Sequence, residues 1–369
     1  MPESRKHVQR IGVLTGGGDC PGLNAVIRVV TKAAINKLGI DVLGIEDGFL
    51  GLIRNRIRPL HQEDVSNILT VGGTILGTSN KADPEHFPVG IGHDGKPVFE
   101  NVTKRVIEHV RENHIDLLVC IGGDGTMSGA SNLIDHGIPC IGVPKTIDND
   151  LMHSDITFGF TTAVQTATEA IDRVHTTASS HHRVMIVELM GRNAGWLTMH
   201  AGLAGGADVI LIPEIPYDIQ SIAEYCKARS KRGKRFTIIA VSEGARPRGG
   251  KQVVDKIVEE SRDPVRLGGI GAVLARQLEE LAGLETRSVL LGHVQRGGTP
   301  VAYDRVLATL FGHKAISMVA THDWNQIVVM KGGQPDMVPI KSVANKQRLM
   351  EHDDPLIGMA RALGTCLGD

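Results

Sequence analysis

The sequence predicts an α/β protein made of two doubly wound domains, with the active site in the cleft between them. Short apolar segments of strand length alternate with helical segments along most of the chain, a pattern typical of parallel sheets. The chain has 369 residues, above the size at which a single hydrophobic core stops growing, which favours two lobes. Glycine-rich turns follow several apolar segments, and open α/β sheets bind ligands at such strand ends.

In the first half, regular alternation is interrupted only by an irregular stretch after residue 45. We expect strands at 10–14, 41–45, 117–121 and 140–143, and helices at 24–37, 102–112 and 126–135. Strands that alternate with helices of this length give a doubly wound, Rossmann-like sheet.

The second half repeats the pattern. We expect strands at 184–188, 209–212, 236–241 and 288–291, and helices at 161–176, 193–204, 219–231, 270–281 and 303–320. The segment 243–267 is the most polar part of the chain and is rich in glycine, proline and charge, so we expect a surface insertion there; its role stays open.

Composition argues against several classes of partner. Lys plus Arg total 40 and Asp plus Glu total 41, which leaves a net charge of −1 and no basic excess for nucleic acid or a membrane surface. Aromatic residues make up 3% of the chain, too few for base-stacking platforms. The five cysteines form no CxxC pair, and the segment "MPESRKHVQR" has no apolar core of a signal peptide. We therefore expect a soluble, cytoplasmic protein with free thiols.

The segment "CIGGDGTM" (120–127) places Asp124 in a glycine turn between a buried strand and a helix. Such a turn offers free backbone N–H groups to a phosphate. A carboxylate there would repel a bare phosphate, so a divalent cation between the two would explain Asp124.

A second glycine turn, "TGGGDCPGLN" (15–24), follows the first strand. It is neither a Walker A loop nor a GxGxxG fingerprint, and by itself it is equally typical of a tight βα turn without a ligand. Two such turns on neighbouring strands would hold the two ends of one polyphosphate.

The segment "PKTIDND" (144–150) carries Asp148 and Asp150 directly after an apolar strand. Phosphoryl transfer to a hydroxyl needs a proton acceptor, and an ordinary Asp, with a pKa near ~3.9, is basic enough. An Asx-turn with capping acids is the alternative interpretation.

Basic residues flank the strands of the second half in four groups, namely "HHR" (181–183), "MGR" (190–192), "TR" (286–287) and "HVQR" (293–296). Arginine suits bidentate phosphate capture, whereas a single arginine is more often a solvated surface charge. Four groups beside strand ends favour a phosphosugar site. Glu243, at another strand end, would accept hydrogen bonds from sugar hydroxyls.

Together, "GVLTGGGDCPGLN", "GGTILGTS", "IGGDGT", "PKTIDND", "VELMGRNAG" and "GHVQRGGTPVAYDR" resemble the bacterial-type 6-phosphofructokinase superfamily, in order, from about residue 10 to 320. The insertion and the ending "GMARALG" resemble its mixed-substrate branch, whose members use ATP or pyrophosphate. The resemblance implies transfer of a phosphoryl group from ATP, with Mg²⁺, to fructose 6-phosphate. It also implies a donor domain at 1–159 plus about 295–345, and a fructose 6-phosphate domain at 160–294 plus 346–369.

The resemblance implies a role for each matching position. Asp148 matches the proton acceptor and Asp124 the magnesium-linked carboxylate, and Thr146 and Arg192 complete the catalytic set. The implied donor-site residues are Gly18, Asn80, Lys81, Gly122, Gly123, Asp124, Gly125 and Thr126. The implied substrate-site residues are Thr146, Ile147, Asp148, Arg183, Met190, Gly191, Arg192, Glu243, Arg287, His293, Val294, Gln295 and Arg296. Arg183 and Arg287 match arginines that reach the site of a neighbouring subunit, which implies a homo-oligomer, dimer or tetramer.

Two positions bear on the donor. Lys145 is typical of pyrophosphate-using relatives, whereas Gly125 stands where those relatives carry Asp. Gly125 leaves room for the α-phosphate, so we predict ATP, with pyrophosphate as the alternative. Asn80 and Lys81 stand where ATP users often carry Arg, and Phe49 stands where Tyr is frequent near adenine.

Two other classes of function fit the sequence less well. A regulatory subunit that binds without turnover is disfavoured because Asp124, Asp148, Arg183 and Arg192 are all present, and a dinucleotide oxidoreductase is disfavoured by the first turn. Arg28 and Lys32 would suit an effector phosphate, but a solvated helix face is the favoured interpretation, and regulation stays open.

Overall fold

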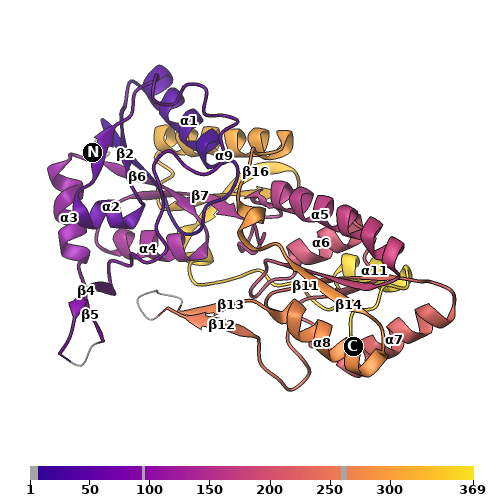
Figure 1. Cartoon of the computed structure of the whole chain (residues 1–369). Coiled ribbons are helices and arrows are strands. Elements are labelled where there is room, and N and C mark those ends of the chain that lie inside the picture. The colour runs from indigo at the N-terminus through magenta and orange to yellow at the C-terminus, as the bar shows by residue number, and fades with distance from the viewer. Residues whose placement is uncertain (1–6, 94–95, 259–263) are drawn as a thin grey trace.

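The computed structural model describes residues 7–93, 96–258 and 264–369, which form two α/β lobes (Figure 1). The larger lobe holds an eight-stranded sheet of order β16-β15-β7-β6-β1-β2-β3, with β8 paired to β7. Its strands are β1 (Arg10–Thr15), β2 (Asp41–Ile45), β3 (Ile57–Pro59), β6 (Leu117–Gly122), β7 (Cys140–Thr146), β8 (Phe158–Gly159), β15 (Gln326–Lys331) and β16 (Gln334–Pro339). The predicted two-lobed α/β fold is confirmed.

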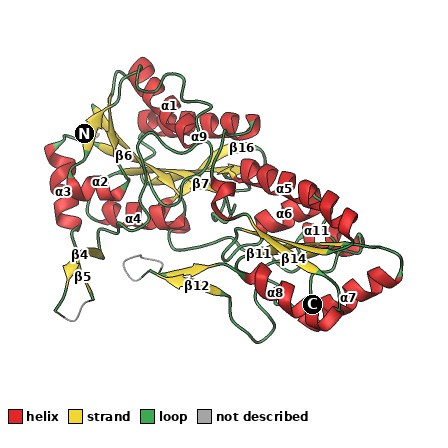
Figure 2. Cartoon of the chain, in the orientation of Figure 1, coloured by secondary structure: helices red, strands yellow, loops and turns green. Residues whose placement is uncertain are grey.

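The smaller lobe holds a four-stranded parallel sheet of order β10-β11-β9-β14. Its strands are β9 (Val184–Leu189), β10 (Val209–Leu211), β11 (Thr237–Ser242) and β14 (Thr286–Leu290). Two separate hairpins, β4–β5 (Phe87–Ile91 and Pro97–Glu100) and β12–β13 (Val254–Ile257 and Val265–Leu267), project from the lobes (Figure 2).

Helices cover both faces of both sheets (Figure 2). They are α1 (Leu23–Ala33), α2 (Phe49–Arg54), α3 (Thr103–Glu112), α4 (Asp124–Asp135), α5 (Phe160–His181), α6 (Trp196–Ala204), α7 (Ile219–Lys231), α8 (Ile270–Ala282), α9 (Ala302–Thr321), α10 (Ile340–Val343) and α11 (Pro355–Ala362). A π-helical turn, Ala34–Leu38, continues α1, and a 3₁₀ turn, Gly292–Arg296, precedes α9. Within the described part of the chain, none of these helices combines the length and apolarity of a membrane span.

Alternation along the central strands explains the layers. Val119 points into one core, with α1 and α9, whereas its neighbours Leu118 and Cys120 point into the opposite core, with α2, α3 and α4. The first core continues beneath α5 and α6 into the smaller lobe, so the two lobes share buried contacts. The opposite face of the smaller sheet packs against α7 and α8.

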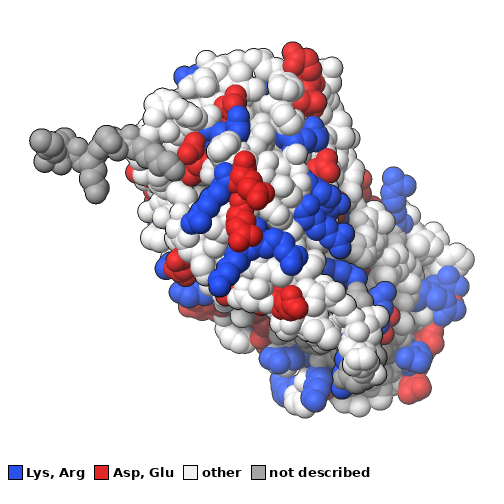
Figure 3. Space-filling model, turned by 90° about the vertical axis from the view of Figure 1, so that its left-hand side faces the viewer, with Lys and Arg blue, Asp and Glu red and all other residues white. Residues whose placement is uncertain are grey.

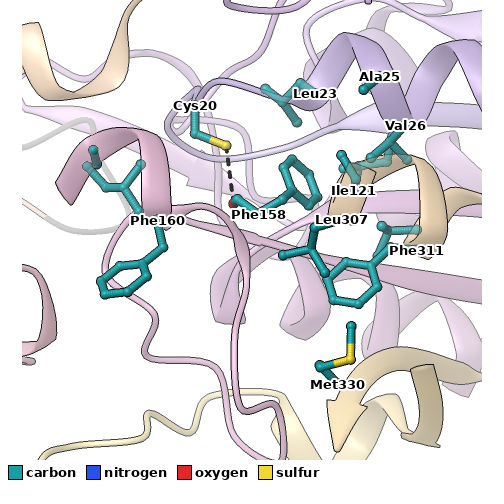
Figure 4. Close-up of a cluster of buried hydrophobic side chains, with 14 of the residues drawn as sticks. Cys20, Leu23, Ala25, Val26, Ile121, Phe158, Phe160, Leu307, Phe311 and Met330 are labelled. Atoms are coloured by element: carbon teal, nitrogen blue, oxygen red, sulfur yellow. Dashed lines mark hydrogen bonds between the residues drawn. The ribbon is translucent and has the colours of Figure 1, made fainter. Parts of the chain in front are cut away.

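The core beneath the first glycine turn is aromatic. Phe158 and Phe311 are fully buried there, beside Leu307 and Met330 (Figure 4). Cys20, within the turn, donates its thiol to the carbonyl of Phe158 at 3.7 Å (Figure 4). Burial raises the pKa of this thiol to about 12, so it stays protonated. All five cysteines are free thiols, as the sequence predicted.

Strand register brings the predicted motifs to one edge. β1, β6 and β7 are parallel, with Thr15 opposite Ile121 and Gly122 opposite Pro144, so their carboxyl ends meet. In the smaller sheet Leu189 stands opposite Ser242, which brings the ends of β9 and β11 together. The segments that follow these strands are therefore neighbours, as the ligand-site prediction required.

Several element boundaries differ from those predicted. The expected helix 193–204 begins only at Trp196, because residues 193–195 form a loop whose Gly195 N–H bonds the Glu214 carboxylate at 2.9 Å. Strand β7 continues to Thr146, which places Lys145 on the strand itself. The short α2, the hairpins and the carboxy-terminal elements β15, β16, α10 and α11 were not anticipated.

The surface carries mixed charge. Figure 3 shows Lys and Arg side chains interspersed with Asp and Glu over the face that lies at the left of Figure 1. Ion pairs such as Arg58–Glu46, at 3.3 Å, and Arg10–Asp41, at 3.0 Å, belong to the larger lobe. This distribution matches the near-zero net charge and has no extended basic field on that face.

Candidate active site

A cavity of about 760 Å³ lies between the two lobes, at the carboxyl ends of the central strands. One wall comes from the glycine turn after β1, the start of α4 and the end of β7. The other comes from residues 192–194, residues of the 243–267 insertion and Arg296. The predicted residues that line this cavity are Gly18, Asn80, Gly123, Asp124, Gly125, Thr126, Lys145, Thr146, Asp148, Arg192 and Arg296.

The first glycine turn favours glycine at position 17 through its backbone conformation, and Arg296 packs closely against Gly18. Gly17 has φ +75°, in the left-handed region that favours glycine. A Cβ on Gly18 would stand 2.7 Å from Nη1 of Arg296, closer than real Cβ atoms approach other atoms. The same Nη1 donates to the carbonyl of Asp19 at 3.1 Å. Because Gly18 has no side chain, the guanidinium of Arg296, which follows the smaller sheet in the chain, can reach the turn after β1.

The second turn leads directly into α4. Asp124 is the first residue of this twelve-residue helix, Gly125 is exposed to the cavity and Thr126 is buried. The unpaired N–H groups and the dipole at a helix start favour an anion. The arrangement can accept a phosphate and, through Asp124, a cation bound to it.

Lys145 joins the two turns. Its side chain is almost fully buried, with 4% exposed, and its ammonium group donates to the carbonyl of Gly18. Burial lowers the pKa of Lys145, while Cys20 and the nearby Asp148 and Asp150 oppose this shift. The ammonium therefore supports the shape of the first turn at the same time as it supplies positive charge to the cavity wall.

The segment 144–150, called the heptad below, begins on β7 and holds its acids in a hydrogen-bonded chain. The backbone N–H of Asp148 donates to Oγ1 of Thr146 at 3.0 Å, and this hydroxyl donates to Oδ1 of Asp150 at 3.1 Å. The Oδ1 atom of Asp148 is buried and, among the described residues, has no hydrogen-bond partner. A buried acceptor without a donor costs free energy unless a ligand supplies one.

Burial and mutual repulsion raise the pKa values of these acids. Burial raises the pKa of Asp148, against the lowering effect of Arg296 and Lys145. Burial, followed by the charges of Asp148 and Asp124, raises the pKa of Asp150 to about 7. A cation that enters this site would relieve the repulsion.

In the smaller lobe, Arg192 follows β9, lines the cavity and donates Nη1 to the carbonyl of Val265 at 2.9 Å. Glu243 follows β11, and burial, followed by the charge of Asp148, raises its pKa to about 7. Met190 donates its backbone N–H to Oε1 of the buried Gln295 at 3.4 Å. These contacts keep the ends of β9 and β11 and the turn before α9 together.

Other predicted residues do not line the cavity. Ile147 is fully buried in the core beneath the heptad, Val294 is 66% exposed, and Gly122 ends β6 behind the turn. The remaining residues outside the lining are Lys81, Met190, Gly191, Glu243, His293 and Gln295.

Arg183 and Arg287 lie away from this cavity. Arg183 precedes β9 whereas Arg192 follows it, and a strand of six residues separates them by about 20 Å. Arg183 and Arg287 both pair with the carboxylate of Glu285, each at 2.8 Å. Within one chain, they therefore do not share the site of Arg192.

The structure adds cavity residues that sequence reasoning missed. Gln252 and Arg266 come from the insertion, and Gln252 donates Nε2 to the carbonyl of Arg192 at 2.9 Å. The predicted surface insertion contains the β12–β13 hairpin, which was not anticipated, and residues of the insertion form part of a cavity wall. Residues 259–263 of the insertion lie outside the described residues. The other additions include Ser79, Asp83, Asn193, Asn345 and Gln347.

The fold and the cavity define a two-domain α/β protein with glycine turns and carboxylates on one wall and arginines on the other. The family model of phosphofructokinase matches residues 10–319, and the chain belongs to this family. It is 48% identical over 363 residues to ATP-dependent 6-phosphofructokinase 2 of Clostridium perfringens, with 98% of this chain and 99% of that one covered. It is also 47% identical over 332 residues to the pyrophosphate–fructose 6-phosphate 1-phosphotransferase of Amycolatopsis methanolica, with 90% and 93% covered.

Solved structures agree with the fold. The phosphofructokinase of Saccharomyces cerevisiae matches 91% of this chain with a TM-score of 0.74 and 30% identity, and this chain spans only 45% of the yeast chain. The pyrophosphate-dependent phosphofructokinase of Nitrosospira multiformis matches with a TM-score of 0.77 at 20% identity, a likeness of fold alone, with 98% and 93% covered.

Proposed function

We propose that this protein is an ATP-dependent 6-phosphofructokinase, which converts fructose 6-phosphate and MgATP to fructose 1,6-bisphosphate and ADP in the cytoplasm. The observation that carries the proposal is the placement of Asp148. Asp148 lines a cavity with the glycine turns on one side and Arg192 and Arg296 on the other, and its buried Oδ1 has no hydrogen-bond partner among the described residues. ATP-dependent 6-phosphofructokinases at 48% and 46% identity over nearly the full length support the assignment.

In this proposal Asp148 accepts the proton of the acceptor hydroxyl as the new P–O bond forms. Arg192 and Arg296 neutralise the charge of the sugar phosphate and of the transferred group. Glu243 would accept hydrogen bonds from sugar hydroxyls, and Met190, Gly191 and the 293–296 turn would shape that end of the site. The first domain (1–159 plus about 295–345) would bind the donor, and the second (160–294 plus 346–369) the fructose 6-phosphate.

A magnesium ion fits the donor end of this site. Mg²⁺ is usually held by one or two carboxylates together with substrate phosphates, and Asp124 stands at the helix start where those phosphates would lie. Among the described residues, no group of three or more His, Cys, Asp or Glu side chains forms a metal cage. When bound, the ion would neutralise the donor phosphates and polarise the transferred group.

Gly125 favours ATP over pyrophosphate, and Lys145 does not argue against ATP. Gly125 is exposed to the cavity and adds neither bulk nor charge where an α-phosphate would lie. Lys145, the residue typical of pyrophosphate users, already donates to the carbonyl of Gly18. Pyrophosphate remains the second candidate donor because the Amycolatopsis relative is named for it at 47% identity.

We further propose a homo-oligomer with composite sites. Arg183 and Arg287 lie too far from this chain's cavity to serve it, so they would serve the cavity of a neighbouring copy. Two exposed apolar side chains lie at the end of β14, the strand that carries Arg287, and just after it. Leu290 is 62% exposed and Val294 is 66% exposed. A second copy would cover them.

A coupled assay at fixed fructose 6-phosphate, with ATP in one series and pyrophosphate in the other, tests the proposal. The two donors are compared by their kcat/KM values, and we expect the value for ATP to be the higher. Binding of fructose 6-phosphate without turnover on either donor would instead indicate a regulatory subunit.

A further inference from the structure

The carboxy-terminal segment 345–350, between α10 and α11, lies against the heptad that carries the proposed proton acceptor. Gln347 forms an antiparallel bridge with Leu151, and the backbone N–H of Arg348 donates to the carbonyl of Asp150 at 2.7 Å. Nη2 of Arg348 donates to the carbonyl of Asn149 at 2.9 Å. The backbone of the heptad is therefore held from the carboxy-terminal side.

The side chain of Gln347 connects the two walls of the cavity. Its Nε2 donates to Oδ2 of Asp150, in the larger lobe, at 3.2 Å. Its Oε1 accepts from Nδ2 of Asn193, in the loop after β9 of the smaller lobe, at 2.9 Å. Both ends of the Gln347 amide therefore form hydrogen bonds. The nitrogen binds the Asp150 carboxylate, and the oxygen binds the loop that carries Arg192.

Flanking contacts fix the position of this amide. Asn345 donates its backbone N–H to Oγ of Ser128, on α4, at 3.1 Å. On the other side, Nε1 of Trp196 donates to the carbonyl of Arg348 at 2.9 Å, and the guanidinium of Arg348 lies over the Trp196 ring, 4.3 Å from its centre. The segment is therefore anchored to both lobes, and Gln347 stands between the anchors.

A continuous chain of hydrogen bonds leads from Gln347 to Asp148. Gln347 holds one oxygen of Asp150, and the Thr146 hydroxyl holds the other. The same hydroxyl accepts the backbone N–H of Asp148. The orientation of the Asp150 carboxylate therefore decides where the Thr146 hydroxyl points, and this hydroxyl sets the backbone that carries Asp148.

We propose that Gln347 is a positioning residue for phosphoryl transfer, which orients the Asp150–Thr146–Asp148 chain and links it to the arginine-bearing loop of the smaller lobe through Asn193. This inference rests on the proposed function, because it assigns Asp148 as the proton acceptor. Gln347 lies 197 residues along the chain from Asp150 and belongs to none of the motifs that predicted the site.

Three variants separate this role from a purely structural one. Q347M removes both hydrogen bonds at similar length. Q347E keeps the length and the acceptor toward Asn193 but places a second carboxylate against Asp150. K346M alters the neighbouring exposed side chain and serves as the matched control.

We expect Q347M to lower kcat about tenfold to a hundredfold, the effect of a lost hydrogen bond to a charged group, with both KM values within about threefold of the parent. Q347E should be slower than Q347M, and K346M should match the parent. Parental kcat in Q347E would show that only the contact with Asn193 matters and would overturn the proposal. The proposal would also be overturned if Q347M and Q347E lost the same fraction of kcat, had the same lowered thermal midpoint and had raised KM values, because that result would indicate a general loss of structure.

Hydrogen exchange of the amides at 146–151 provides a readout that does not need activity. Exchange of the Asp148 amide should be about tenfold or more faster in both Gln347 variants than in K346M, because this amide donates into the chain of hydrogen bonds. Unchanged exchange overturns the positioning role. A parent protein without turnover refutes the proposed function separately, since the exchange comparison still decides whether Gln347 holds the heptad.

Discussion

Replacing Gly125 by Asp tests the assignment of the donor directly. Gly125 is the second residue of α4, lies next to Asp124 and is exposed to the cavity. An aspartate at this position would add a carboxylate to a wall that already carries Asp124, with Asp148 and Asp150 on the same cavity. It would also occupy the space in which the α-phosphate of ATP is proposed to lie.

The size of the effect follows from the repulsion between the new carboxylate and a phosphate. Two like charges 4 Å apart repel by about 4 kcal/mol at an effective dielectric constant near ~20, and by about 1 kcal/mol in bulk water. Because Gly125 is exposed, we expect a repulsion energy between these limits. A repulsion of about 1 kcal/mol lowers ATP affinity about fivefold, and one of about 4 kcal/mol lowers it about a thousandfold. Pyrophosphate, which has no α-phosphate beyond its two phosphoryl groups, should lose less.

The assay compares kcat/KM for ATP and for pyrophosphate in the parent, G125D and G125N. The asparagine variant has nearly the same volume without the charge, so it isolates the steric part. We expect the parent to prefer ATP, G125D to lose ATP activity, and G125N to lie between them. A parent that prefers pyrophosphate, or a G125D protein that keeps its ATP activity, would refute the reasoning.

Three further predictions concern the proton acceptor, the oligomer and stability. Asp148→Ser should lower kcat by roughly 10²–10⁴ with nearly unchanged donor binding, and a nearly parental kcat would end the assignment of Asp148. Mixing Asp148→Ser protein with Arg183→Ser protein should restore some activity if sites are shared, whereas mixed oligomers without recovery would contradict shared sites. Burial, then Asp148, raises the pKa of Glu243 from its ordinary 4.5 to about 7, so the folded state holds a proton that the unfolded state releases. The associated stability is complete below pH 4.5, is lost as pH rises towards 7, and amounts to about 3 kcal/mol. Thermal unfolding of Glu243→Gln should therefore show a smaller decrease between pH 5 and 8 than the parent, and parallel curves would contradict it.

The sequence predicted those parts of the site that follow directly from strand ends. Asp124, Asp148 and Arg192 each stand within a few residues of an apolar strand, and the carboxyl ends of parallel strands meet at one edge. Glycine patterns located the turns, and at position 17 the left-handed backbone, with φ +75°, favours glycine. Local sequence is sufficient to place a site residue when its position depends only on the strand that it follows.

The remainder of the site depends on contacts between distant segments. Gln347 and Arg266 reach the cavity from a carboxy-terminal segment and from the insertion hairpin, and neither lies beside a predicted strand. Periodicity describes which face of an element is buried, not which loop packs against another. The "QIVVMKGGQPDMVP" pattern did contain a hairpin signal, two apolar runs around Gly332 and Gly333, which became β15 and β16.

The donor question shows how far similarity reaches. An ATP-dependent relative and a pyrophosphate-named relative are 48% and 47% identical to this chain, so overall identity does not separate the two donors. Lys145 and Gly125 differ in what each can change. Lys145 is buried and bonded to the turn after β1, a contact that supports phosphate binding with either donor. Gly125 lines the cavity. In the proposed site, a side chain at this position would meet the part of ATP that pyrophosphate lacks. The choice of donor should therefore depend on the smaller of the two residues.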